Sequence, residues 1–250
     1  MIRNSSHRSS SFFPLPSSFF LLPSEINYQP VENTLGIDLG ITNYVYLSNG
    51  AQVENPRFLR KSADKLARLQ AKLANRVKGS QPWKIIKNKI SRCHQFVARA
   101  RLDFQFKTAQ ELLSKCEVLV VEDLSVKNLT RRAKPKTDIE NGNLVYLPNS
   151  QSAKSGLNKS MLDAAHGQFA NVLKYVAWKL GKRVLFVDPK GTSQHCWNCL
   201  NKVPKELSQR WHSCLCGESL DRDENSAKLI RKIGLSYKSG GGTPSLKKAF

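Results

Sequence analysis

Four cysteines in the last third of the chain form two close pairs. Cys196 and Cys199 are separated by two residues, and Cys214 and Cys216 by one, with fourteen residues between the pairs. Zinc prefers four soft ligands in a tetrahedron, and two close pairs of thiolates supply them. The spacing therefore predicts a four-thiolate zinc site. Such a site has no open position for a substrate, so its expected role is to fold a small module.

The zinc pattern departs from common knuckles in two ways. The second pair is tighter than the usual two-residue spacing, and Leu200 stands where knuckles often carry glycine. His195 and His212 are alternative ligands, although four thiolates suffice. The two remaining cysteines, Cys93 and Cys116, are predicted to be buried small apolar residues.

Three acids indicate a second metal site. Asp38 and Glu122 each stand at the end of an apolar, strand-like run, and Asp223 lies in an acidic motif that opens a helix. Hydrolysis of a phosphodiester needs a hydroxide nucleophile and neutralisation of the leaving oxygen. Two magnesium ions about 4 Å apart meet both needs, and magnesium takes carboxylate oxygens. The three acids are therefore the predicted catalytic, magnesium-binding residues.

Each acid also has a plainer interpretation. A strand-end aspartate often forms a turn, and Asp221 or Asp223 can cap the helix that follows. The segment from Asp38 to Asn43 is similar to the phosphate hairpin of sugar-kinase and actin-like ATPases. Those proteins need a second glycine-rich loop, and the one glycine cluster here, 240–242, begins a predicted flexible tail.

Strands and helices must bring these residues together. Asn49-Gly50 predicts a hairpin turn, because both residues accept positive φ. Apolar spacing predicts two helices within 57–116, broken at 79–82. The remaining predictions are strands at 35–40, 44–47, 51–53, 118–122 and 183–187, a long loop at 130–158, and helices at 163–180, capped by Gly181, and at 221–233.

The charge of the chain predicts a polyanionic partner. The net charge is +21 and the pI about 9.9, so nucleic acid is the first interpretation and an anionic membrane surface the second. No segment approaches the roughly 20 apolar residues of a membrane helix. The segment from Arg57 to Lys107 contains fifteen basic residues and only two acidic ones. This one-sided charge favours contacts with phosphates over an ordinary solvated surface. The predicted contacts are Arg57, Arg60, Lys61, Lys84, Lys87, Arg99 and Arg101.

Several of these motifs together resemble the TnpB/OrfB family of transposon-encoded proteins, relatives of type V CRISPR nucleases. The matching segments are 36–40, 101–104, 121–124, 156–160, 163–169, 192–194, both cysteine pairs, and 221–225. The resemblance implies an α/β, RNase H-like (RuvC) mixed sheet with flanking helices and an inserted four-cysteine zinc ribbon. It implies an RNA-guided DNA endonuclease in which Asp38 bridges two metals while Glu122 and Asp223 complete the site. Asp223 is chosen over Asp221 because the family's acid lies two residues before the asparagine, here Asn225.

The resemblance also implies a domain division. It comprises a disordered or foreign segment at 1–32, a nuclease core at 33–189 with a helical insertion at 57–116, the ribbon at 190–219, a last helix at 220–235 and a tail at 236–250. The first 24 residues mimic a signal peptide, but Pro14, Pro16 and Pro23 interrupt the apolar run. Family members carry well over a hundred residues before the first catalytic strand. We therefore expect the nuclease half of a truncated gene.

The expected partners are DNA and, if the N-terminal region is dispensable, a guide RNA, with no membrane; the oligomeric state is left open. The expected location is the prokaryotic cytoplasm, at the nucleoid. A second hypothesis is a catalytically inactive nucleic-acid-binding zinc protein that regulates transposition. A third is a zinc-ribbon partner of ribosomes or RNA polymerase, against which the ordered set of three acids argues.

Overall fold

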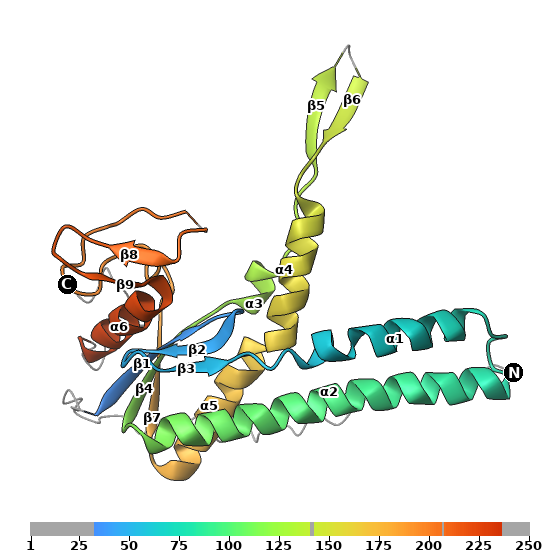
Figure 1. Cartoon of the computed structure of the whole chain (residues 1–250), viewed down its shortest axis with the longest axis horizontal. Coiled ribbons are helices and arrows are strands. Elements are labelled where there is room, and N and C mark those ends of the chain that lie inside the picture. Colours follow the sequence, from blue (N-terminus) through green and yellow to red (C-terminus); the bar gives the residue numbers. More distant parts are fainter. Residues whose placement is uncertain (1–32, 141–142, 207, 237–250) are drawn as a thin grey trace, which may run out of the picture.

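A five-stranded mixed sheet forms the centre of the computed structural model, which describes residues 33–140, 143–206 and 208–236 (Figure 1). Its order is β3-β2-β1-β4-β7: β1 pairs antiparallel with β2 and parallel with β4, and β7 is parallel to β4. The bounds are Thr34–Leu39 for β1, Asn43–Leu47 for β2, Gln52–Glu54 for β3, Val118–Glu122 for β4 and Arg183–Val187 for β7. The predicted mixed sheet is confirmed, while the segments predicted as foreign (1–32) and as a tail lie outside the described residues, apart from Ser236.

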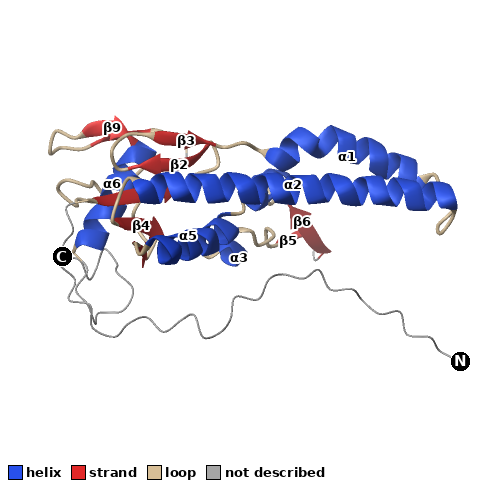
Figure 2. Cartoon of the chain, turned by 90° about the horizontal axis from the view of Figure 1, so that it is seen from below, coloured by secondary structure: helices blue, strands red, loops and turns tan. Residues whose placement is uncertain are grey.

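Helices cover both faces of the sheet, and the side chains of β4 pack into the core on each face. Side chains alternate along a strand, so Leu119 and Val121 pack into one core with α2 and α5. Val118 and Val120 pack into a second core under α6. This is why β4 is apolar at every position before its final glutamate. Figures 1 and 2 show α5 and α6 on opposite sides of the sheet.

The predicted helical insertion is a long antiparallel hairpin of α1 (Phe58–Ala74) and α2 (Gln81–Ser114). Ser80 caps α2 by accepting a hydrogen bond from the Trp83 amide at 3.4 Å. No side chain at the start of α1 does the same. Instead Asp163, a hundred residues later, accepts from the Leu59 and Arg60 amides at 3.0 and 3.2 Å, which fixes the hairpin to the body. Figure 2 shows α1 and α2 extending side by side.

The prediction of a loop over 130–158 is wrong. The segment contains a β-hairpin, β5 (Lys136–Glu140) with β6 (Asn143–Leu147), and most of α4 (Gln151–Ala164); a short α3 (Val126–Leu129) precedes it. The β5–β6 hairpin projects from the body at the N-terminal end of α4 (Figure 1). Ile139 and Tyr146 are more than two-thirds exposed. Strands are recognised in a sequence by alternating apolar and polar residues, which arise when one face is buried, and these exposed strands lack that pattern.

The prediction of a single helix over 163–180 is also wrong, because the chain bends at Ala165. Ala165 has a φ of 53°, and it separates α4 from α5 (His166–Leu180). Alanine is the best helix former, so its type gives no sign of this break. Gly181, with a φ of 66°, ends α5 as predicted.

The last elements are a small antiparallel pair, β8 (Trp211–Ser213) and β9 (Ser219–Asp221), and α6 (Arg222–Leu235), the predicted last helix. α6 lies directly against β1, because Gly36 has no side chain: a Cβ there would stand 2.6 Å from the Arg231 amide nitrogen. Within the described residues, no helix is long and apolar enough to cross a membrane.

Candidate metal centres

The four predicted zinc ligands converge at one point. Their sulfur atoms all lie within 4.8 Å of one another, with Cys196 and Cys216 at 3.6 Å and Cys199 and Cys214 at 3.4 Å. A tetrahedron with metal–sulfur bonds of about 2.3 Å has edges of about 3.8 Å. The donor set therefore fits a single tetrahedral metal ion, and a metal that prefers thiolates, such as zinc, suits it best.

Tight turns bring the two knuckles of this site together. The Leu200 amide donates to the Cys196 carbonyl, and the Gly217 amide donates to the Cys214 carbonyl, both at 3.0 Å. Leu200 takes a left-handed φ of 65°, as expected where knuckles often carry glycine. Neither alternative ligand belongs to the sulfur group: the His195 Nδ1 is 2.8 Å from the Gly191 carbonyl, and His212 is fully buried on β8.

The three predicted catalytic acids share the α6 side of the sheet. On β1, Ile37 faces the α2–α5 core, so Asp38 and Gly36 face α6. On β4, Glu122 follows the alternation of Val118 and Val120 and so has the same orientation. Asp223 lies in the first turn of α6 itself. Burial raises the pKa of Asp38 well above its ordinary value, and the negative charges of Glu122 and Asp223 raise it further.

Glu122 is almost fully buried and has one hydroxyl partner. The Thr192 hydroxyl oxygen lies 2.5 Å from its Oε1 and 2.9 Å from the Pro189 carbonyl. Burial raises the pKa of Glu122 to about 7, the Thr192 hydrogen bond opposes this rise, and the charge of Asp188 adds to it. A hydroxyl carries one hydrogen, so it donates to the carboxylate when Glu122 is ionised, because the charged acceptor is stronger.

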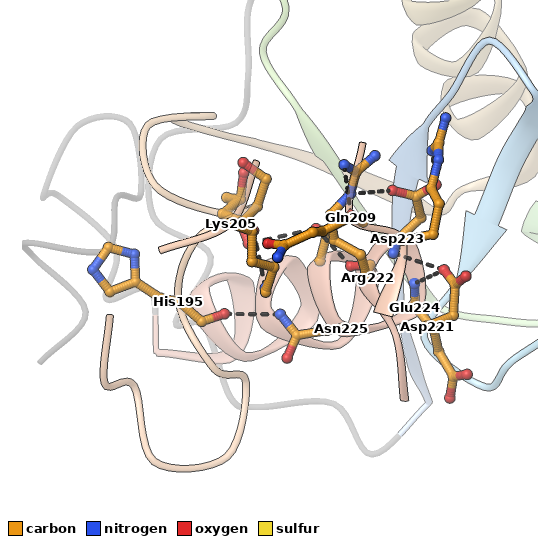
Figure 3. Close-up of polar contacts among 12 residues, drawn as sticks. His195, Lys205, Gln209, Asp221, Arg222, Asp223, Glu224 and Asn225 are labelled. Atoms are coloured by element: carbon orange, nitrogen blue, oxygen red, sulfur yellow. Dashed lines mark hydrogen bonds and ion pairs between the residues drawn. The ribbon is translucent and has the colours of Figure 1, made fainter. Parts of the chain in front are cut away.

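Asp223 is held by two guanidinium groups (Figure 3). Its Oδ2 accepts from Arg210 Nη1 and its Oδ1 from Arg222 Nε, both at 3.1 Å. Asp221 is the helix cap, since its side chain accepts from the Asp223 and Glu224 amides. Of the two residues that the sequence offered as caps, Asp221 and Asp223, the structure uses Asp221. The carboxylate of Asp223 points instead toward the two guanidinium groups.

This carboxylate group fits hard divalent cations by donor type. Within the described part of the chain, only the cysteine group has three or more ligand atoms within 4.8 Å of one another, so the three acids are more widely spaced. Two of the three acids have raised pKa values, so a bound divalent cation would favour their ionised forms and displace their protons.

The predicted nucleic-acid contacts lie along the helical hairpin. Arg57 is half-buried at the start of α1, Arg60 and Lys61 are exposed in its first turn, and Lys84 and Lys87 are exposed near the start of α2. Arg99 lines an open groove of about 420 Å³ with Arg92 and Phe96. Arg101 is different: its Nη2 lies 3.1 Å from Asp163 Oδ1, in an ion pair whose side chains are 18% and 8% exposed.

Sequence reasoning missed several neighbours of the acids. Thr192 lies in one of the segments that match the family, but its type and spacing do not indicate a contact with Glu122, and those of Arg210 do not indicate a contact with Asp223. These contacts cross 70 and 13 residues, and no local pattern reports them. Asp188 did leave a signal. It directly follows the apolar strand β7, which resembles the pattern that indicated Glu122, the last residue of β4.

Two family models match separate parts of the chain. The model of OrfB from IS605, described as "Probable transposase", matches residues 21–133. The model of the Cas12f1-like TNB domain matches residues 166–230, which include all four clustered cysteines and Asp223.

Similar proteins extend over most of the chain. Two carry the name "Putative RNA-guided DNA endonuclease": InsQ of Escherichia coli (strain K12), 33% identical over 82% of this chain and 50% of its own length, and a Streptomyces pristinaespiralis protein, 30% identical over 83% and 46%. TnpB-like protein L79 of Acanthamoeba polyphaga mimivirus is 26% identical over 82% of this chain and 38% of its own length. The chain thus spans about half the length of the first two relatives.

The fold has a counterpart among solved structures. A chain in the cryo-EM structure of the Cas12f1–sgRNA–target DNA complex aligns with a TM-score of 0.52 at 16% identity, over 84% of this chain and 52% of that one. At this identity the match bears on the fold, and it agrees with the mixed sheet and flanking helices described above.

Proposed function

This chain belongs to the TnpB/OrfB family of transposon-encoded proteins, and we propose that it carries the catalytic half of a RuvC-type, metal-dependent DNA endonuclease. The observation that supports this proposal is that Asp38, Glu122 and Asp223 share the α6 side of one sheet, where the charges of Glu122 and Asp223 raise the pKa of Asp38. Similarity to proteins named RNA-guided DNA endonucleases supports the same reaction class.

The carboxylates have the chemistry that phosphodiester hydrolysis requires. Magnesium, when bound, supplies a hydroxide at neutral pH and neutralises charge on the attacking and leaving oxygens. The role of the protein is to hold ionised oxygens at fixed positions. Burial raises the pKa values of Asp38 and Glu122, so their protons must leave when a cation binds, and affinity should rise with pH.

Arg210 and Arg222 set a further requirement. Both oxygens of Asp223 accept hydrogen bonds from these guanidinium groups. Each oxygen keeps a second lone pair, but a metal cation that uses Asp223 must approach against two positive charges. Arg210 is 56% exposed as a side chain, whereas Arg222 is 15% exposed. Arg210 is therefore the contact more easily given up, for example to a phosphate of the substrate.

DNA is the proposed substrate and an RNA the proposed second partner. The net charge of +21 and the basic helical hairpin favour a polyanion. The names of the two relatives refer to both an RNA guide and a DNA target, and the solved complex contains both. The proposed contacts are the six exposed or half-exposed cations of the predicted set, without Arg101, whose guanidinium is paired with Asp163.

The four-thiolate group is proposed to bind one structural zinc ion. Its sulfur geometry fits a closed tetrahedron, and a closed site cannot accept substrate. The ribbon (residues 190–219) meets α6 through Trp197, whose amide donates to Asn225 Oδ1 at 3.1 Å. Zinc would thus hold the segment that packs beside Asp223.

The test is cleavage of end-labelled single-stranded DNA by the zinc-loaded chain with magnesium or manganese. The informative variants are Asp38→Asn and Glu122→Gln, which remove one charge each with little change in shape. Asp64→Asn, at an exposed position on α1, is the matched control for charge loss. We expect metal-dependent cleavage by the wild type and Asp64→Asn, and a loss of at least about a hundredfold in the other two.

Equal cleavage by all four proteins would identify a contaminating nuclease. Absence of cleavage by the wild type, with and without RNA from the transposon end, would refute the proposal. If DNA binding persisted in that case, the chain would be a binding protein without catalysis.

A further inference from the structure

Thr192 stands where three elements that carry the site meet. It is 3% exposed, and its hydroxyl lies 2.5 Å from Glu122 Oε1 at the end of β4. Its amide and hydroxyl both reach the Pro189 carbonyl, just after β7. Its own carbonyl lies 3.5 Å from the Ser226 hydroxyl on α6, whose nearer acceptor is the Arg222 carbonyl at 3.1 Å. One residue thus contacts the strand with Glu122, the segment that follows the neighbouring strand β7, and the helix with Asp223.

Thr192 is also at the entrance to the ribbon. The amides of Gln194 and His195 donate to the Gly191 carbonyl at 3.0 and 3.2 Å, which winds the chain directly from Thr192 toward Cys196. The far end of this turn is fixed on α6, because Asn225 Nδ2 donates to the His195 carbonyl at 2.8 Å (Figure 3). This turn therefore connects Thr192 directly to the first knuckle.

The hydrogen bond from Thr192 engages one of the two carboxylate oxygens of Glu122. In the described structure Thr192 is the one hydrogen-bond donor to the Glu122 carboxylate, and it uses Oε1. Oε2 remains available to ligate a cation. A donor that fixes one oxygen and leaves the other free holds a carboxylate in a defined rotamer, which is how outer partners of metal ligands raise affinity.

We propose that Thr192 is a positioning residue that orients Glu122 for metal binding and makes this orientation depend on the zinc-loaded ribbon. The inference rests on the proposed function, since it takes Glu122 as a metal ligand. It assigns the ribbon a second task beyond folding itself: through Thr192, four residues before the first thiolate, it sets the geometry of the carboxylate site.

The test measures Mn²⁺ binding by the full-length, zinc-loaded chain, with electron paramagnetic resonance of free Mn²⁺ as readout. Thr192→Val removes the hydroxyl and keeps the shape, and Thr192→Ser keeps the hydroxyl. Thr108→Val makes the same change at another buried threonine, 5% exposed on α2. We expect Thr192→Val to weaken Mn²⁺ binding about tenfold or more, with Thr192→Ser and Thr108→Val within threefold of the wild type.

Equal binding by Thr192→Val and the wild type would overturn the inference. So would equal losses in Thr192→Ser and Thr192→Val, because the serine variant keeps the hydroxyl, and a general disturbance of packing at this position would then account for both losses. If Thr192→Val lost its zinc or its fold, Thr192→Ala compared with Thr192→Ser would isolate the hydroxyl in the same way. A wild-type chain that binds no Mn²⁺ would also overturn it, whereas Mn²⁺ binding without DNA cleavage would leave it standing and refute the proposed function alone.

A double variant tests the dependence on the ribbon. Cys214→Ser should weaken Mn²⁺ binding in the wild-type background. If the ribbon acts through Thr192, adding Thr192→Val to Cys214→Ser should cause little further loss, because coupled changes are not additive. Losses that multiply would show that the ribbon and Thr192 act independently and would overturn that part of the inference.

Discussion

Gly36→Ala should separate the two elements that carry Asp38 and Asp223. Gly36 lies on β1 directly under α6, and an added Cβ would stand 2.6 Å from the Arg231 amide nitrogen and closer still to the Ala227 carbonyl oxygen. Both obstacles are backbone atoms, which cannot rotate away. Ordinary contact begins at 3.4 Å, so α6 must move from β1 by about 0.8 Å or more to relieve the overlap.

Both stability and activity should respond to this shift. Overpacking of this kind costs about 2 kcal/mol, which for a chain of this size lowers the melting temperature by about 4–8 °C. The same movement carries Asp223 away from Asp38. Because a misplacement of about 1 Å can cost a hundredfold in rate, we expect metal-dependent cleavage to fall roughly 10- to 100-fold at a temperature where the variant is still folded.

The assays are calorimetric melting and cleavage of labelled DNA, with Gly156→Ala as the matched control. Gly156 lies within α4, and a Cβ there would meet nothing within 4 Å. The control should be as active as the wild type and up to about 1 kcal/mol more stable, because alanine favours a helix over glycine.

A Gly36→Ala variant that melts and cleaves like the wild type would refute the described contact between α6 and β1. A lowered melting temperature with unchanged cleavage would keep the contact and refute the argument that it sets the spacing of the acids.

Three further changes test other parts of the structure. Cys214→Ser should lower bound zinc from one equivalent to well below one, measured by atomic absorption, and lower the melting temperature. Asp163→Asn should cost about 2 kcal/mol, read from urea unfolding, because Arg101 loses its ion pair and two α1 amides lose a charged acceptor. The third change concerns pH. Burial raises the pKa of Glu122 from 4.5 to about 7, so the unfolded chain loses this proton first as pH rises. The free energy of unfolding therefore falls between about pH 4.5 and 7, and Glu122→Gln, which lacks this fall, should gain stability relative to the wild type from pH 5 to pH 8 in magnesium-free buffer.

Each of these three predictions has a result that would contradict it. Unchanged zinc content in Cys214→Ser would mean that a histidine or water replaces the thiolate. An Asp163→Asn variant as stable as the wild type would show that the ion pair is replaceable by water. A stability difference between Glu122→Gln and the wild type that is the same at pH 5 and pH 8 would mean that the pKa of Glu122 is not raised.

Local patterns predicted much of the fold. The spacing of four cysteines identified the group that converges in space, the Asn49-Gly50 pair marked the turn between β2 and β3, and Gly181 marked the end of α5. Each signal is short-range, since it depends on the geometry of a few consecutive residues. The errors fell where local preference and tertiary context disagree, at Ala165 and in the exposed β5–β6 hairpin.

The sequence alone determined which side chains can bind metal and which segments form the five strands of the central sheet, because ligand type and periodicity are properties of the chain. It did not decide which face of the sheet Asp38 and Glu122 share. A strand that is buried on both faces, such as β4, has no alternation of polar and apolar residues to show which side chains point to which face. Only the tertiary structure decided that α6 covers that face, that Thr192 reaches Glu122 across 70 residues, and that two arginines hold Asp223. These contacts arise from packing between distant elements, where steric fit at a residue such as Gly36 sets the distances between functional groups.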